Sequence, residues 1–276
     1  MFGRDRIEYK SREQIATMRA AGIVVAGALA AARDAAVPGA TTQDVDQAAA
    51  AHIAAAGATP SFLGYEGFPA TICTSVNDEV VHGIPGERVL QTGDLLSIDC
   101  GAIVDGWHAD AAVSLLVGGG DVADSRLVEV TEHAMWAGIA ALATGSRLGE
   151  VGEAVQDAVE KAEAEDGVLY GIVEEYVGHG IGSQMHQDPD VVNFRTRERG
   201  PRLRAGMCLA VEPMITRGTS EVAVCEDDWT VVTGDGTRSA HWEHSVAILD
   251  DGILVLTAPD GGASALAAFG VTPVTV

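Results

Sequence analysis

The sequence predicts an α+β fold, because helices followed by strands occur twice along the chain and no low-complexity linker separates the two stretches. With 276 residues, 47% of them hydrophobic, the chain can bury a sizeable core. We therefore expect a single domain over residues 1–276. Its two halves should cover about 11–120 and 121–256 and resemble each other.

Two helices are predicted first. Ser11 and Gln14 have the spacing of a capping box, and a helical pattern continues from them to about Asp34. Thr41 or Thr42 can cap a second helix that ends near residue 57, before a strand at 70–75.

A β-hairpin is predicted for residues 95–117, with Asp105-Gly106 as a two-residue turn. In the register that this turn sets, Asp110 pairs with Gly101. Asp99 and Asp110 then lie on one face of the hairpin as diagonal cross-strand neighbours.

The second half repeats the order with two helices and then short strands. The helices are expected at 124–143 and 148–165, and the strands around 173, 207–215, 230–232 and 242–249.

Asp99 and Asp110 sit in an otherwise apolar hairpin. Two carboxylates on an apolar face repel each other and lose hydration, so one must be protonated or a cation must lie between them. A wet face, or pairing of each acid with an arginine, is the alternative.

The second half offers further ligands. Glu212 lies in an apolar strand that ends at Pro213, Glu243 lies in another strand-like segment, and His179 lies between two glycines that allow close backbone approach. Each residue alone could be a satisfied structural group. Together with the hairpin acids they make four carboxylates and one imidazole, which match the charge of two divalent cations. This oxygen-rich, thiol-free set suits Mn, Fe, Co or Zn.

Composition excludes several other classes of protein. A net charge of −23 disfavours nucleic acid or an anionic membrane as the main partner. The apolar run Ala20–Ala32 is too short to span a bilayer, no signal-peptide pattern precedes it, and the four cysteines are scattered. We therefore expect a cytoplasmic protein. HExxH, GxSxG and P-loop motifs are missing from the sequence.

Six ordered motifs resemble type I methionine aminopeptidase, from about Ser11 to Leu256. They are NDEVVHGIP (77–85), SIDCGAIVDGWHAD (97–110), GHGIG (178–182), MHQDP (185–189), VEPM (211–214) and HWEHS (241–245). The resemblance implies the pita-bread fold, with a dinuclear metal site between two pseudo-symmetric halves.

The resemblance also implies a role for each metal ligand. Asp110 and Glu243 would bridge both ions, Asp99 would chelate one, and His179 and Glu212 would bind the other. Glu212 would in addition relay the proton of the attacking water.

Substrate contacts follow from the same likeness. His186 is expected at the scissile carbonyl and His82 at the scissile amide nitrogen, although either could be an ordinary surface residue. The methionine side chain would be held by Tyr65, Phe68, Cys73 and Trp229, whose alternative role is core packing, while Phe62 and Met185 leave the pocket width open. We interpret the other histidines as structural or exposed: His52, His108, His133, His241 and His244.

The implied activity is removal of the N-terminal methionine from nascent peptides with a small second residue, by attack of a metal-bridged hydroxide on the first peptide bond. The alternatives are a related peptidase that cleaves Xaa-Pro or other dipeptides, and a non-catalytic binding module of the same fold. We expect a monomer. A basic loop could contact the ribosome, or could be a solvated loop with local ion pairs; its arginines are Arg195, Arg197, Arg199, Arg202 and Arg204.

Overall fold

The computed structural model describes residues 7–276, so residues 1–6 of the predicted domain lie outside the described part. Four long helices carry most of the helical structure: α1 (Arg12–Ala35), α2 (Thr42–Ala55), α3 (Val122–Thr144) and α4 (Gly149–Asp166). Two short helices follow near the end of the chain, α5 (Ala263–Leu266) and η2 (Ala267–Phe269), and η1 (Tyr65–Gly67) is a single turn. The order of helices and then strands occurs twice, as predicted.

The first half is a sheet covered by α1 and α2. Strands β1 (Thr59–Pro60), β4 (Leu95–Val104) and β2 (Ile72–Val76) are neighbours in that order, and β5 (Trp107–Leu116) pairs with β4. Ser11 caps α1 through the predicted capping box with Gln14, and Thr41 caps α2. Apolar side chains of both helices pack on Ile98 and Cys100 of β4, so the alternate residues of β4 point to the opposite face.

The hairpin register is the predicted one. Asp105 and Gly106 form the turn with positive φ angles of 49° and 80°, and Asp99 pairs with Ala112 while Asp110 pairs with Gly101. The two acids therefore share the face that points away from α1 and α2.

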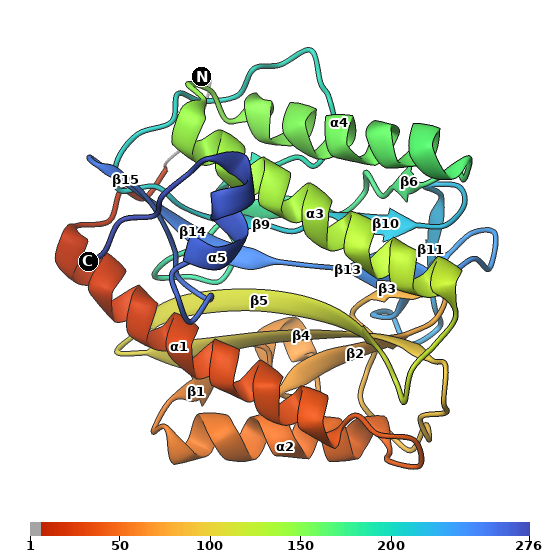
Figure 1. Cartoon of the computed structure of the whole chain (residues 1–276). Helices are drawn as coiled ribbons and strands as arrows, with labels where there is room; N and C mark the ends of the chain where they lie inside the picture. Colours follow the sequence, from red (N-terminus) through yellow and green to blue (C-terminus); the bar gives the residue numbers. More distant parts are fainter. Residues whose placement is uncertain (1–6) are drawn as a thin grey trace.

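The second half contains a five-stranded and a three-stranded sheet. The strand order in the larger sheet is β15-β14-β9-β7-β8, and in the smaller one it is β13-β10-β6. Their strands are β6 (Gly171–Ile172), β7 (Gly178–Gly180), β8 (Gln187–Val191), β9 (Cys208–Val211), β10 (Met214–Thr216), β13 (Ser239–His241), β14 (His244–Leu249) and β15 (Gly252–Val255). Helices α3 and α4 pack on these strands in a second core. Figure 1 shows the strands of both halves lying between α2 and α4.

A small sheet joins the two halves. Strand β3 (Glu79–Val81) from the first half pairs with β12 (Val231–Thr233), which pairs with β11 (Val222–Val224).

Two of the predicted strands differ from the strands in the structure. The strand expected at 207–215 is interrupted at Glu212-Pro213 between β9 and β10, and the one at 242–249 is preceded by β13 and interrupted at Trp242-Glu243. β9 pairs with β14 and β10 pairs with β13, so the two interruptions face each other. Proline cannot donate to a strand ladder, which accounts for the first interruption.

A seam of hydrogen bonds links β5 of the first half to residues 241–245 of the second. Figure 1 shows β5 running alongside β13 and β14. Ala112 and Glu243 exchange two backbone bonds of 3.3 and 3.0 Å. Serine hydroxyls make the next contacts along the seam on each side of this pair. The Ser245 hydroxyl accepts from the Asp110 N–H and donates to the Asp110 C=O. The Ser114 hydroxyl accepts from the His241 N–H and donates to the His241 C=O. The seam continues an antiparallel ladder with serine hydroxyls at its ends.

Helix α1 as a whole is long and apolar enough to cross a membrane, although its run Ala20–Ala32 alone is not. Its apolar face packs on β4, β5 and α2, and 44% of its most apolar window is buried. Core helices of soluble proteins can be equally long and apolar, so we interpret α1 as a core helix.

Candidate metal centre

One cavity of about 300 Å³ collects every residue that the sequence analysis assigned to the site. Its walls contain Asp99, Asp110, His179, Glu212 and Glu243, then His82 and His186, and the aromatic and thiol side chains Tyr65, Phe68, Cys73 and Trp229. Phe62, Glu66, Tyr176, Val177, Met185 and Met214 complete it.

The acidic floor of the cavity is formed by both halves. The hairpin supplies Asp110, which is 4% exposed, and the partly buried Asp99. Glu212 and Glu243 come from the two strand interruptions that face each other, and both are buried. Because the interruptions lie beside the seam with β5, acids that are over one hundred residues apart in the chain meet on one side of the sheets.

Burial and mutual repulsion act against ionisation of these acids. Burial, followed by the charge of Asp110, raises the pKa of Asp99, Glu212 and Glu243 well above its ordinary value. Burial also raises the pKa of Asp110, to about 7. A buried cluster of this kind is stable only if it binds protons or cations.

His179 is held as a neutral imidazole. Its Nδ1 lies 3.0 Å from the carbonyl oxygen of Gly180, to which it can donate, and its Nε2 lies 3.3 Å from Glu212 Oε1. Donation from Nδ1 leaves the Nε2 lone pair free toward the cavity. Burial lowers the pKa of His179 to about 3, and nearby His186 adds to this effect.

Glycines on both sides of His179 allow neighbouring strands to approach. A Cβ on Gly178 would lie 2.3 Å from the carbonyl oxygen of Ala210, and one on Gly180 would lie 2.3 Å from that of Asp188. The predicted reason for these glycines, close backbone approach, therefore holds.

The donor set fits divalent cations. Within residues 7–276, the buried oxygens Asp99 Oδ1, Asp110 Oδ1 and Glu243 Oε1 have no hydrogen-bond partner. Ligand atoms of Asp110, His179 and Glu243 lie within 4.8 Å of one another. Uncompensated buried carboxylate oxygens around one imidazole nitrogen are what a cation site requires.

His82 enters the cavity from a constrained loop. Its φ angle is 60°, which is rare for a residue with a side chain and typical of functional sites. Its ring packs edge-on against Tyr176 and Trp229, with centroids 5.5 and 6.2 Å away. Burial, with a contribution from His186, lowers the pKa of His82 to about 4, so the imidazole is neutral.

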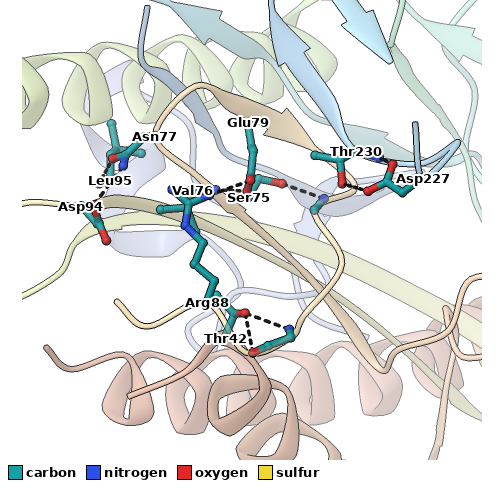
Figure 2. A network of polar contacts seen from close by, with 12 residues as sticks. Thr42, Ser75, Val76, Asn77, Glu79, Arg88, Asp94, Leu95, Asp227 and Thr230 are labelled. Atoms are coloured by element: carbon teal, nitrogen blue, oxygen red, sulfur yellow. Dashed lines mark hydrogen bonds and ion pairs between the residues drawn. The ribbon is translucent and has the colours of Figure 1, made fainter. Parts of the chain in front are cut away.

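Polar contacts fix the chain on both sides of His82, and Figure 2 shows those of Ser75, Val76, Glu79 and Arg88. The Ser75 hydroxyl accepts from the Gly83 N–H at 3.1 Å, and Glu79 accepts from the Val76 N–H and from Arg88. In the same view Asp227 accepts from Thr230, which stabilises the turn that carries Trp229.

His186 is exposed at the mouth of the cavity. Its ring centroid lies 4.3 Å from that of His179, and its Nδ1 lies 2.9 Å from the Tyr65 hydroxyl. Tyr65, which was expected to hold the methionine side chain, thus also orients an imidazole that could donate from Nε2.

An apolar pocket adjoins the acids. Phe62, Phe68, Cys73 and Met185 are buried together, and Trp229 packs edge-on against Phe68 with centroids 5.1 Å apart. Cys73 pairs directly with Asp99 across β2 and β4, so the pocket begins beside the carboxylates.

The structure places one of the remaining histidines beside the site and adds a wall residue. His241 is only 2% exposed, and its Nε2 lies 3.6 Å from Glu212 Oε2, so it belongs to the surroundings of the site. Strand alternation from Glu243 was the available signal, because residues two apart point to one face. Tyr176 carried no comparable signal. His244 faces away as expected, where it contacts Thr257 and Trp136.

The arginine-rich loop is exposed, and part of it pairs with helix α4. Arg195 forms ion pairs with Asp157 and Glu160, and Arg199 lies 3.8 Å from Glu150. Local ion pairs, the alternative considered for this loop, are therefore present for these two arginines.

Comparison with known proteins places this geometry in a family. Residues 16–250 match the model of metallopeptidase family M24. Methionine aminopeptidase 1 of Mycobacterium tuberculosis is 52% identical over 92% of this chain and 96% of its own length. Methionine aminopeptidase 1 of Bacillus subtilis is 43% identical over 90% of this chain and 98% of its own.

Solved structures agree on the fold. Methionine aminopeptidase from Thermotoga maritima superposes with a TM-score of 0.86 at 40% identity, over 91% of this chain and 99% of its own. Prolidase from Pyrococcus furiosus reaches 0.70 at 19% identity, over 91% of this chain and 65% of its own, which shows a shared fold alone. The predicted pita-bread fold is thereby confirmed.

Proposed function

This chain belongs to metallopeptidase family M24 and is a type I methionine aminopeptidase, and from this membership and the site geometry we infer how it removes the N-terminal methionine of peptides. One observation supports the site assignment above all: the five metal-ligand candidates, both substrate histidines and the pocket residues line one cavity.

Asp99, Asp110, His179, Glu212 and Glu243 would hold two divalent ions, which supply Lewis acidity and a nucleophile at neutral pH when bound. The charge of four carboxylates matches two such ions. Cobalt, manganese, iron and zinc all suit these ligands, and we propose that cellular supply selects among them.

Glu212 is the proton carrier in this proposal. It is buried next to His179 and reaches the cavity, so it can accept a proton from the attacking water and return it to the leaving amine.

The two substrate histidines act on opposite sides of the scissile bond. With Tyr65 on Nδ1, His186 can present an Nε2–H to the carbonyl oxygen as negative charge develops there. Neutral His82, fixed between Tyr176 and Trp229, would contact the scissile amide nitrogen.

The methionine side chain would fill the apolar pocket of Phe62, Phe68, Cys73, Met185 and Trp229 beside Asp99. A hydrophobic pocket discriminates by only about 1–3 kcal/mol per methylene, so selection of methionine is expected to be moderate. The second residue should be small, because the space beside the metal ligands is tight.

The natural substrates are nascent peptides, and we place the reaction in the cytoplasm where they arise. We also propose that the arginine loop contacts the ribosome. Of its side chains, Arg197, Arg202 and Arg204 are exposed and form no ion pair within the described residues. The enzyme should act as a monomer.

Cleavage of Met-Ala and Ala-Pro peptides, before and after chelation and metal return, tests the assignment. We expect cleavage of the Met-Ala peptide alone, lost on chelation and restored by metal. Preference for Ala-Pro would instead indicate the dipeptide-cleaving alternative, and inactivity toward both with metal present would indicate a binding module.

A further inference from the structure

His241 faces the proposed proton carrier from the side opposite to His179. Its Nε2 lies 3.6 Å from Glu212 Oε2, whereas His179 Nε2 lies 3.3 Å from Glu212 Oε1. The two carboxylate oxygens of Glu212 are thus each faced by a different imidazole. Among the described residues, His241 Nε2 is buried and has no hydrogen-bond partner.

The backbone of His241 is fixed from two directions. The Ser114 hydroxyl accepts from its N–H at 2.9 Å and donates to its C=O at 2.8 Å, and His241 pairs with Met214 across β13 and β10. Ser114 is held in turn by Ser97 at 2.8 Å. The position of the His241 ring is therefore set by the seam between the halves.

We propose that His241 is a positioning residue that donates its Nε2–H to Glu212 Oε2 and so holds Oε1 toward His179 and the metals. The inference rests on the proposed function of Glu212. A buried N–H without an acceptor is costly, and a carboxylate oxygen lies just beyond hydrogen-bond range. A shift of a few tenths of an ångström closes that distance, and bonds of this kind tighten when the site is filled.

Such a bond has a clear consequence for metal binding. Carboxylates that bind metals are oriented by hydrogen bonds from neighbouring groups, and loss of such a neighbour costs about 10–100-fold in metal affinity or activity. Since Glu212, His241 and Glu243 also offer atoms within 4.8 Å of one another, direct ligation by His241 is the competing arrangement.

Two substitutions separate these arrangements. His241→Gln keeps an N–H donor on a side chain of similar reach, and His241→Leu removes the donor. Titration of the metal-free proteins with Mn²⁺ by calorimetry should show affinity for one ion falling about 10–100-fold in His241→Leu and staying within about threefold in His241→Gln. With a Met-Ala peptide at saturating Mn²⁺, kcat should fall in the leucine variant with little change in KM.

His244→Leu is the matched control, because it removes a half-buried histidine three residues away whose ring contacts Thr257 and Trp136 outside the cavity. It should lower the Tm without changing Mn²⁺ affinity. Equal losses in both His241 variants would overturn the proposal in favour of direct ligation. Unaltered Mn²⁺ affinity and kcat in His241→Leu would overturn it as well, because His241 would then neither position Glu212 nor bind metal.

A measurement on the unmodified protein serves where a variant fails to fold. Long-range ¹H–¹⁵N correlation spectra of the metal-free enzyme should show His241 protonated at Nε2, and a proton on Nδ1 alone would overturn the proposal. Failure of the wild-type protein to bind Mn²⁺ would overturn the proposed function and this inference together. A wild-type enzyme that binds Mn²⁺ and cleaves, beside an unaltered leucine variant, would overturn the inference alone.

Discussion

The two halves of the molecule bring their acids to the cavity in different ways. Asp99 and Asp110 belong to one continuous hairpin whose register follows from its own turn. Glu212 and Glu243 lie where two pairs of strands are interrupted, and His179 lies on a three-residue strand between glycines. The first arrangement depends on local sequence. The second depends on neighbours that are far away in the chain, and in the proposed function Glu212 carries a proton in addition to binding metal.

Glu212→Gln should produce the largest change, because it removes the proton carrier and leaves the shape of the side chain. We expect kcat for a Met-Ala peptide to fall about 10²–10⁴-fold, with no recovery at high Mn²⁺ concentration. Near-normal turnover with metal bound would show that the acids of the second half only hold metal, the role that we propose for the hairpin acids.

Asp99→Asn should test the hairpin side of the comparison. Removal of a ligand charge should weaken Mn²⁺ binding by at least the roughly 10–100-fold that loss of a supporting hydrogen bond costs. Because the proposal gives Asp99 no role in proton transfer, activity should recover substantially when Mn²⁺ is added in excess. An activity loss that excess metal leaves untouched would contradict this division of roles.

Glycine substitutions compare the stability of the two arrangements directly. Gly106→Ala, in the hairpin turn with open space around it, should cost about 1 kcal/mol through its positive φ angle alone. Gly180→Ala places a methyl group against the carbonyl of Asp188 and should cost about 3 kcal/mol. Urea unfolding measures both, and equal costs would show that the second half is no more dependent on close backbone approach.

The smallest expected effect concerns the N-terminal segment that supports the loop of His186. Burial raises the pKa of Glu8, but hydrogen bonds from Ser183 outweigh it and bring the pKa to about 2. The pKa of Glu8 is lower in the folded protein than in the unfolded chain, where it is about 4.3. The ionised carboxylate therefore stabilises the fold above about pH 4.3, and this contribution is lost as the pH falls toward 2.

Glu8→Gln should therefore flatten the decline of Tm between about pH 4.5 and pH 2 and change little at pH 7 beyond the loss of that contribution. Thermal scans of both proteins across this range measure it. Parallel curves would show that Glu8 is not coupled to the second half.

What could be predicted from the sequence follows the same division. The capping box of Ser11 and Gln14 and the Asp105-Gly106 turn are encoded within a few residues, so the first helix and the hairpin register were correct. The grouping of four acids and one histidine was proposed from charge and from family motifs, and one cavity brings them together.

The rest depended on contacts that no local pattern encodes. The facing interruptions at Glu212 and Glu243 exist only once β9, β10, β13 and β14 have paired, and Tyr65 meets His186 across 121 residues of sequence. His241 was within reach, because alternation from Glu243 assigns it to the same face, but the interruption between β13 and β14 obscured that relation.

The hydroxyl-ended seam between β5 and residues 241–245 has a further consequence for how a peptide enters. Opening the halves like a clamshell would break the bonds of Ala112 with Glu243 and would pull Asp110 away from its partner across the gap. The two halves need not separate for a peptide to reach the cavity, because its mouth beside the exposed His186 is already open to solvent.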